Sequence, residues 1–255
     1  MSVQVHNPHS VAAALETRPE DVLDLVIPAH GGKDDAWARV AELAKQNRVQ
    51  ISGSRGAGSP AHGKGSSNRR GGENDGRTSA AHASLKERAG ISAEELFADA
   101  RERAGGHGLW LALDSLQDPH NVGAIFRAAA FFGVQGILLT EERSAPLTGT
   151  VYDVACGGVE YVPFTLQTNL QRAFEIAKDA GLWILGTSEH ANDDLESIEK
   201  DRPWLLVLGN EEKGLRRLTQ ETCDVLCKIA PAGKVTSLNV SVAAGIFISS
   251  LTSRS

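Results

Sequence analysis

The sequence predicts an α/β fold in which helices cover both faces of a parallel sheet, together with a small N-terminal α/β domain. From Leu109 onward, short strands of continuous apolar residues alternate with helices, a pattern typical of a parallel sheet buried on both faces. Before residue 52, the chain carries its own shorter set of helix and strand patterns. We therefore expect a small domain over residues 1–51, a linker over 52–90 and a large domain over 91–255.

In the small domain, helical spacing and short apolar runs predict two helices and two strands. In chain order they cover residues 11–15 (helix), 22–27 (strand), 34–46 (helix) and 49–51 (strand). Residues 52–79 follow, where Gly and Ser fill 14 of 28 positions and Val, Ile, Leu and aromatic residues are absent. Such a segment buries too little surface to offset the entropy cost of ordering it, so we expect a flexible Gly/Ser/Arg-rich linker.

The large domain is expected to contain six strands and five helices. The strands are predicted over residues 109–113, 136–140, 161–166, 182–186, 204–208 and 225–229. The helices are predicted over residues 93–103, 122–132, 151–155, 170–180 and 238–251. Gly133 and Gly181 directly follow two of these helices, in the position where a glycine commonly ends a helix.

Charge is distributed unevenly along the chain. The formal net charge is −6, yet residues 48–88 contain eight Lys/Arg and only three Asp/Glu. An acidic body that carries a local basic segment is compatible with non-specific contact to phosphate groups. A solvated spacer explains the same composition, and both interpretations stay open.

The sequence lacks the signature motifs of several classes of protein. The three cysteines are Cys156, Cys223 and Cys227, and the C-x3-C pair has no second Cys/His pair to complete a metal site, so we expect no metal. The sequence holds no GxGxxG, GxxxxGK[ST] or GxSxG motif. No apolar run approaches the ~20 residues that span a bilayer. The first ten residues lack a secretory signal, so we expect a cytoplasmic protein without a membrane segment.

Polar, Gly-containing turns follow four of the predicted strands. They lie at residues 114–123, 186–189, 209–214 and 231–239. Ligands of parallel sheets bind beyond the carboxyl ends of the strands, so these turns together predict a binding site.

Three of these turns carry a family resemblance. Residues 118–129 (DPHNVGAIFRAA) resemble the first motif of the SPOUT-class, TrmH-like RNA ribose 2′-O-methyltransferases. Residues 208–215 (LGNEEKGL) resemble the second motif, and residues 237–243 (SLNVSVA) resemble the third. The motifs occur in the family's order, and the similarity extends over residues 109–251.

Other segments are most similar to one branch of that family, which methylates a guanosine ribose in large-subunit (23S) rRNA. These segments are residues 143–145 and 154–157. Residues 7–15 resemble the start of that branch's small RNA-binding domain of ribosomal-protein-like fold. The family's usual glycine is absent there and the Gly/Ser-rich stretch follows, so we expect a reduced RNA-binding domain.

The resemblance implies S-adenosylmethionine as the cofactor, a deep C-terminal trefoil knot (the SPOUT α/β-knot), RNA as a partner, and a homodimer whose active site takes residues from both subunits. It implies catalytic roles for Asn121, Arg127, Glu211, Ser237 and Asn239. It implies cofactor contacts, made mostly by backbone groups, at Gly186, Thr187, Gly209, Ile229 and Leu238.

Each polar candidate also has a structural explanation. Asn121 and Ser237 lie at predicted helix starts, where both are good N-caps, and Glu211 could be an exposed loop residue. Arg127 lies on an otherwise apolar helix. Because a guanidinium has a pKa above ~12 and hardly deprotonates, we expect Arg127 to clamp a phosphate or a developing alkoxide rather than act as a base.

The expected reaction is methyl transfer to a ribose 2′-hydroxyl of RNA, with a guanosine in 23S rRNA as the main substrate hypothesis. The same chemistry on tRNA is the first alternative. A catalytically silent RNA-binding relative is an alternative of another class.

Overall fold

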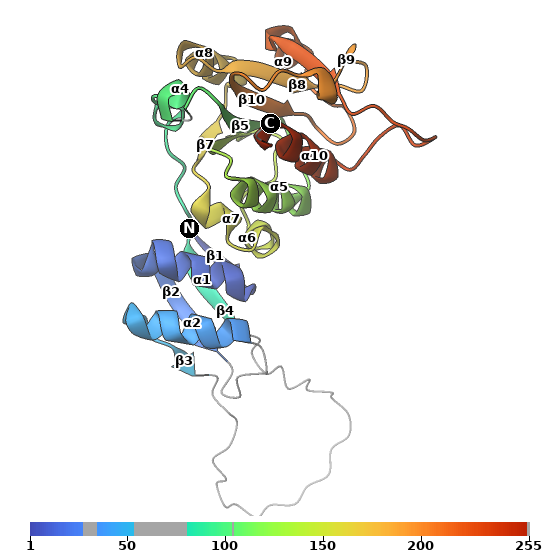
Figure 1. Ribbon diagram of the computed structural model, residues 1–255. Helices are drawn as coiled ribbons and strands as arrows, with labels where there is room; N and C mark the ends of the chain where they lie inside the picture. Colours follow the sequence, from blue (N-terminus) through green and yellow to red (C-terminus); the bar gives the residue numbers. More distant parts are fainter. Residues whose placement is uncertain (28–34, 54–80, 104, 254–255) are drawn as a thin grey trace, which may run out of the picture.

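The computed structural model describes residues 1–27, 35–53, 81–103 and 105–253. Most of the predicted linker, residues 54–80, lies outside the described part. The N-terminal part forms a four-stranded sheet with its own helices, and the remainder forms a seven-stranded sheet with helices on both faces (Figure 1).

The N-terminal sheet has the strand order β1-β4-β2-β3. Its elements are β1 (Ser2–Val5), α1 (Pro8–Thr17), η1 (Pro19–Asp21), β2 (Val22–Ile27), α2 (Asp35–Gln46), β3 (Ser52–Gly53) and β4 (His82–Lys86). Asn7 caps α1 by accepting a hydrogen bond from the backbone of His9, and Pro8 occupies the first turn. The predicted strand over 22–27 is confirmed, and β3 lies just after the predicted strand over 49–51.

One prediction about the linker is wrong. Residues 82–86, assigned to the linker over 52–90, form β4, which pairs antiparallel with both β1 and β2. Ala83 and Leu85 are fully buried while their neighbours face outward, which is the alternation of a strand with one face on a core. The N-terminal sheet is therefore completed only after the Gly/Ser-rich stretch, although the division into domains stays a prediction.

The large sheet has the order β7-β6-β5-β10-β8-β11-β9, and all of its neighbouring strands run parallel, as predicted. Its strands are β5 (Gly108–Leu113), β6 (Gly136–Thr140), β7 (Phe164–Gln167), β8 (Trp183–Thr187), β9 (Asp193–Asp194), β10 (Pro203–Leu208) and β11 (Val225–Lys228). Alternate residues of β5 enter two different cores, with Leu111 in one and Trp110 in the other. Helices must therefore cover both faces.

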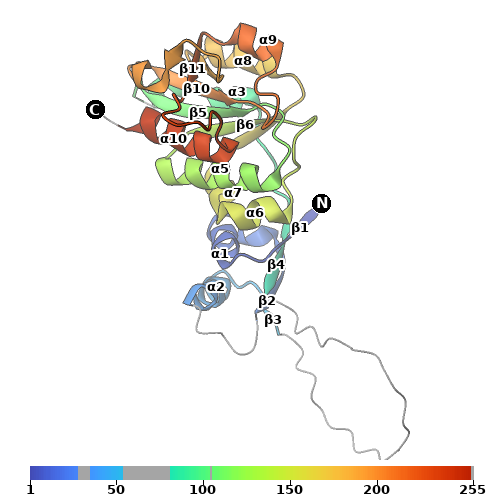
Figure 2. The same cartoon turned by 90° about the vertical axis from the view of Figure 1, so that its right-hand side faces the viewer.

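Figures 1 and 2 show how the helices are layered. On one face lie α5 (Pro119–Phe132) and α10 (Val240–Thr252); on the other lie α3 (Ala93–Phe97), α8 (Leu170–Asp179) and α9 (Arg217–Thr222). Between α5 and the N-terminal helices lie α6 (Gly149–Ala155) and α7 (Gly158–Tyr161) (Figure 2). The short η2 (Leu195–Ser197) and α4 (Ala100–Arg103) complete the described elements.

Two predicted elements differ from the structure. The helix expected over 93–103 is two helices, α3 and α4, and Asp99 between them has a φ of 50°. The strand expected over 161–166 begins only at Phe164, because the preceding residues form α7. Within the described ranges, no helix is both long and apolar enough to cross a bilayer.

Candidate active site

A cavity of about 420 Å³ opens beyond the carboxyl ends of β8, β10 and β11. It lies where the order of the strands reverses. After β5, the next strands β6 and β7 lie on one side of β5, whereas β8, β10 and β11 lie on its other side, with β10 between β5 and β8. Such switch points are the usual ligand sites of parallel sheets. Six of the predicted site residues line the cavity: Thr187, Gly209, Glu211, Ile229, Ser237 and Leu238.

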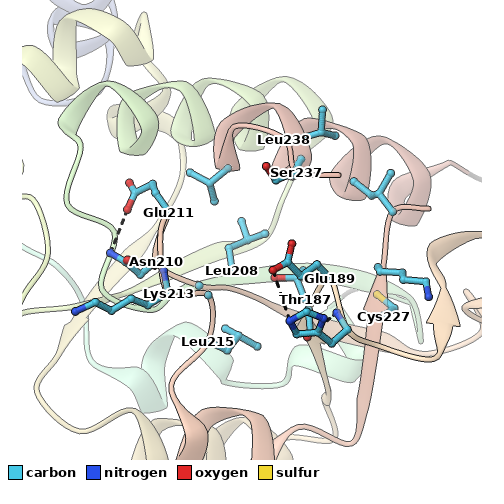
Figure 3. A pocket seen from close by; sticks show the side chains of 18 of the residues that line it. Thr187, Glu189, Leu208, Asn210, Glu211, Lys213, Leu215, Cys227, Ser237 and Leu238 are labelled. Atoms are coloured by element: carbon cyan, nitrogen blue, oxygen red, sulfur yellow. Dashed lines mark hydrogen bonds and ion pairs between the residues drawn. The ribbon is translucent and has the colours of Figure 1, made fainter. Parts of the chain in front are cut away.

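Figure 3 shows Ser237 and Leu238 on the segment that enters α10, on the opposite side of the cavity from Leu215. Leu208, the last residue of β10, lies between these walls. Glu211 and Thr187 lie on opposite sides of Leu208 (Figure 3). The cavity is therefore a slot whose lining mixes apolar and polar side chains.

Gly209 allows the backbone to close one wall of this slot. A Cβ on Gly209 would lie 2.3 Å from the carbonyl carbon of Gly214 and 2.4 Å from the amide nitrogen of Leu215, so no side chain fits there. Gly186 does not line the cavity. A Cβ on it would lie 2.6 Å from Cys223 Sγ, so its role is to let α9 and β11 pack closely against β8.

Hydrogen bonds join the three motif segments beside the cavity. Asn239 donates from Nδ2 to Asn121 Oδ1 at 3.0 Å, and Asn121 donates from Nδ2 to Glu211 Oε1 at 3.2 Å. Asn121 is only 6% exposed. The structure therefore brings together three of the five predicted catalytic residues. Ser237, two residues before Asn239, lines the cavity wall.

The helix caps differ from the structural explanations that the sequence offered. Asp118, not Asn121, caps α5 by accepting a hydrogen bond from the His120 backbone at 2.8 Å. Asn239, not Ser237, caps α10 through the Ser241 backbone. Because the capping roles are filled by other residues, the Asn121 amide is available for the chain of hydrogen bonds.

Sequence reasoning missed a buried carboxylate behind the site. Asp114 directly follows β5 and is fully buried. It forms an ion pair with Arg216, with 2.7 Å between Arg216 Nε and Asp114 Oδ1, and it accepts hydrogen bonds from Thr219 Oγ1 at 2.8 Å and from Ser115 Oγ at 3.0 Å. Asp114 thus ties the end of β5 to the end of the second motif loop, where α9 begins. An acidic residue immediately after a buried strand was the signal available in the sequence.

Asn210 connects this buried anchor to the catalytic candidates. Ser115 has a φ of 64°, an uncommon conformation for a residue other than glycine. Its carbonyl accepts a hydrogen bond from Asn210 Nδ2 at 2.9 Å, and the same nitrogen lies 3.2 Å from Glu211 Oε2 (Figure 3). The orientation of Glu211 therefore depends on Asn210 and, through Asn210, on Ser115. The motif resemblance had assigned a role to neither residue.

Arg127 lies apart from this cluster. It is exposed on α5, and its side chain makes no hydrogen bond or ion pair with other residues that the structure describes. It follows Asn121 by six helical residues, which places it about 9 Å further along the axis and on a different side of the helix. Within one chain, the structure does not bring Arg127 to the Asn121–Glu211–Asn239 cluster.

Cys223 and Cys227 are protonated at neutral pH. Burial raises the pKa of each thiol to about 12, and Cys227 lines the cavity. Among the described residues, no group of three or more His, Cys, Asp or Glu side chains is placed to hold a metal ion.

The fold is that of the SpoU methyltransferases. The crystal structure of the SpoU methyltransferase AviRb from Streptomyces viridochromogenes, in complex with AdoMet, superposes with a TM-score of 0.74 at 20% identity, over 98% of this chain and 89% of that one. The SpoU rRNA Methylase family model matches residues 108–249, and the chain belongs to this family.

Curated relatives extend the similarity beyond the family domain. A protein of Pseudomonas aeruginosa named 23S rRNA (guanosine-2′-O-)-methyltransferase RlmB is 37% identical over 246 residues, which is 95% of this chain and 93% of the relative. The protein of that name in Nitrosomonas europaea is 49% identical over 138 residues, or 54% and 53% of the two chains. The first alignment thus includes the N-terminal part as well.

Replacing Asp114 by asparagine tests the buried anchor. Loss of a charged, buried hydrogen-bond acceptor is expected to lower the free energy of unfolding by about 1.5–3 kcal/mol, and to weaken S-adenosylmethionine binding because the second motif loop loses its tie to β5. Urea denaturation and calorimetric titration measure the two effects.

Glu221→Gln on α9 is the matched control, because its ion pair with Arg217 is exposed at the surface and such pairs contribute about 0–1 kcal/mol. Equal effects of the two substitutions on donor affinity would contradict the anchoring role of Asp114.

Proposed function

We propose that this protein transfers a methyl group from S-adenosylmethionine to the ribose 2′-hydroxyl of a guanosine in 23S rRNA. The observation that carries the proposal is the chain of hydrogen bonds Asn239–Asn121–Glu211, which joins all three family motifs at the edge of a small-molecule cavity. The relatives' names supply the substrate, since the proteins aligned over most or half of this chain are named for guanosine 2′-O-methylation of 23S rRNA.

The cavity suits S-adenosylmethionine in size and chemistry. Its volume of about 420 Å³ lies within the ~300–1,000 Å³ typical of small-molecule sites. Ile229 and Leu238 supply apolar walls, Gly209 brings backbone amides close, and Thr187, which donates to the Val207 carbonyl at 3.0 Å, holds β8 against β10 at the cavity edge. When bound, this cofactor supplies a methyl group already activated by its sulfonium centre.

The polar residues then position the ribose. We expect the amides of Asn121 and Asn239, with the Ser237 hydroxyl, to contact ribose or phosphate oxygens beside the donor cavity. Glu211 accepts from Asn121 and so fixes which way that amide points. Because the methyl group is pre-activated, correct placement of the attacking oxygen contributes much of the rate.

The position of Arg127 supports a homodimer. His120, Arg127 and Phe131 share an exposed stripe of α5, and the Phe131 side chain is 82% exposed. On the neighbouring helix α10, Val242 and Ile246 are also exposed, although a helix that is apolar on all sides is normally covered. A second copy of this chain would cover this surface, and Arg127 of the partner subunit would then complete each active site as an anion clamp.

The remaining expectations belong to the same proposal. Residues 91–255 would form the methyltransferase domain with its trefoil knot, and residues 1–51 together with β4 would form the RNA-binding domain. A cytoplasmic location follows from the proposed ribosomal substrate.

Mapping of 2′-O-methyl groups tests the substrate. We expect 23S rRNA from cells that lack the gene to lose methylation at one guanosine, and expression of the gene to restore it. Loss of a tRNA methyl group with unchanged 23S rRNA would favour the tRNA alternative. If the purified protein bound no S-adenosylmethionine in calorimetry, the chain would instead be a catalytically silent relative.

A further inference from the structure

Helices α6 and α7 lie between the N-terminal domain and the catalytic helix α5 (Figures 1 and 2). They belong to the large domain in sequence, yet they contact α1 and β1 on one side and α5 on the other. These two short helices therefore form a large part of the contact between the two domains.

A buried ion pair joins α1 to α7. Arg18, at the end of α1, donates from Nε and Nη2 to the two carboxylate oxygens of Glu160, at 2.8 and 2.7 Å. Arg18 is 8% exposed and Glu160 is 4% exposed. Arg18 also donates to the carbonyl of Lys86 at the end of β4, at 2.6 Å. This two-pronged geometry defines direction as well as distance.

Backbone groups are tied across the same junction. Asp153 Oδ1, on α6, accepts from the backbone amides of His6 and Asn7, each at 2.7 Å. The Ser10 hydroxyl donates to the Tyr152 carbonyl at 2.6 Å and accepts from the Gly157 amide at 3.0 Å. Bonds to backbone atoms leave less freedom than bonds between long side chains, so α1 is held in one orientation.

The packing around α6 and α7 leaves no room for sliding. A Cβ on Gly149 would lie 2.1 Å from the Gln4 carbonyl oxygen, on the side of the N-terminal domain. A Cβ on Gly158 would lie 2.5 Å from the Phe126 carbonyl oxygen, on the side of α5. Residues of both domains also share one hydrophobic core. The junction is thus packed like the interior of a single domain.

We infer that the N-terminal domain and the methyltransferase domain act as one rigid body, in which Arg18 and Glu160 are positioning residues that fix the distance between RNA held by the N-terminal domain and α5. The inference rests on the proposed function for the identity of the ligand, a folded ribosomal RNA. Only a nucleotide at the matching distance from the bound RNA element reaches the active site, so the junction contributes to the choice of target.

A disulfide across the junction tests this rigidity with a cysteine that the chain already has. Asn7 Nδ2 lies 3.3 Å from Cys156 Sγ, so Asn7→Cys places a second thiol beside Cys156. Cys223 and Cys227 compete poorly, because burial raises the pKa of both. We expect the crosslink to form completely under mild oxidation, and the oxidised and reduced forms to methylate an unmodified 23S rRNA transcript at rates within about twofold.

Asn7→Ser is the matched control, because serine keeps the helix cap but cannot crosslink. Failure of the folded variant to form the disulfide would overturn the inference without reference to activity. A tenfold or larger loss of activity on oxidation, reversed by reduction, would also overturn it, since a hinged domain would then be required. If the wild type bound S-adenosylmethionine but left 23S rRNA unmethylated while the disulfide still formed, the proposed substrate would fail and the rigid junction would stand.

A second variant addresses positioning itself. Arg18→Lys keeps the charge but cannot make the two-pronged contact with Glu160. We expect about a tenfold rise in KM for the rRNA transcript with an unchanged Kd for S-adenosylmethionine. An unchanged KM in a variant with proven loss of the Glu160 contact would overturn the positioning role.

Discussion

Replacement of Arg127 by alanine is expected to lower kcat by about 100- to 1,000-fold, the usual effect of removing one preorganised donor to a developing negative charge. The affinity for S-adenosylmethionine should stay unchanged, because Arg127 does not line the donor cavity. Single-turnover methylation of the rRNA transcript and calorimetric titration of the donor separate the two quantities. Arg127→Lys should recover only part of the rate, since a lysine keeps the charge but loses the planar pair of donors.

A mixing experiment asks whether Arg127 serves the neighbouring subunit. Arg127→Ala and Asn239→Ala should each be nearly inactive alone. Mixed dimers contain one site in which both residues are intact, so a random mixture of two-fold dimers should regain about a quarter of the wild-type rate. No recovery would show that Arg127 and Asn239 act within one chain, and the proposed dimer arrangement would fail.

Gly209→Ala is expected to have the largest effect on donor binding. The added methyl group would overlap the backbone at Gly214 and Leu215, which cannot move aside as a flexible side chain would. Forcing such an overlap costs about 3 kcal/mol, which corresponds to roughly 100-fold weaker binding if the loop opens to relieve it. Calorimetric titration with S-adenosylmethionine measures the change, and circular dichroism verifies that the variant remains folded.

Gly233→Ala provides the matched control for this substitution. Gly233 lies in the segment between β11 and α10, and a Cβ there would have no heavy atom within 4 Å among the described residues. Its affinity for the donor should equal that of the wild type. Equal binding by Gly209→Ala would mean that the donor does not use the wall formed by residues 209–215.

The parallel sheet and its binding edge could be predicted because their signals are local. Continuous apolar runs predicted β6 at its observed bounds and β5, β8 and β10 within one residue at each end. The glycine after β10 indicated a close backbone approach, and the cavity lies there. Strands that are buried on both faces are easy to locate in a sequence, because they are continuous runs of apolar residues without alternating polar positions.

The rest depended on contacts that no short window contains. β4 is a five-residue strand whose partners, β1 and β2, lie far away in sequence. The carboxylate of Glu160 forms its ion pair with Arg18, which lies 142 positions earlier in the chain, so its burial could not be anticipated. The start of α5 was placed three residues late, although Pro119 after Asp118 is a favourable combination for a helix start.

The order of strands in the N-terminal sheet constrains how this chain can be divided by engineering or by evolution. β4 lies between β1 and β2, so a fragment that ends before His82 lacks the strand that joins β1 to β2 and β3. A gene fusion, transplant or expression fragment that keeps this part intact must retain everything up to Lys86, where β4 ends. The segment that must be kept together is therefore longer than the small domain over residues 1–51 that the composition suggests. It includes the Gly/Ser-rich sequence as an internal insertion.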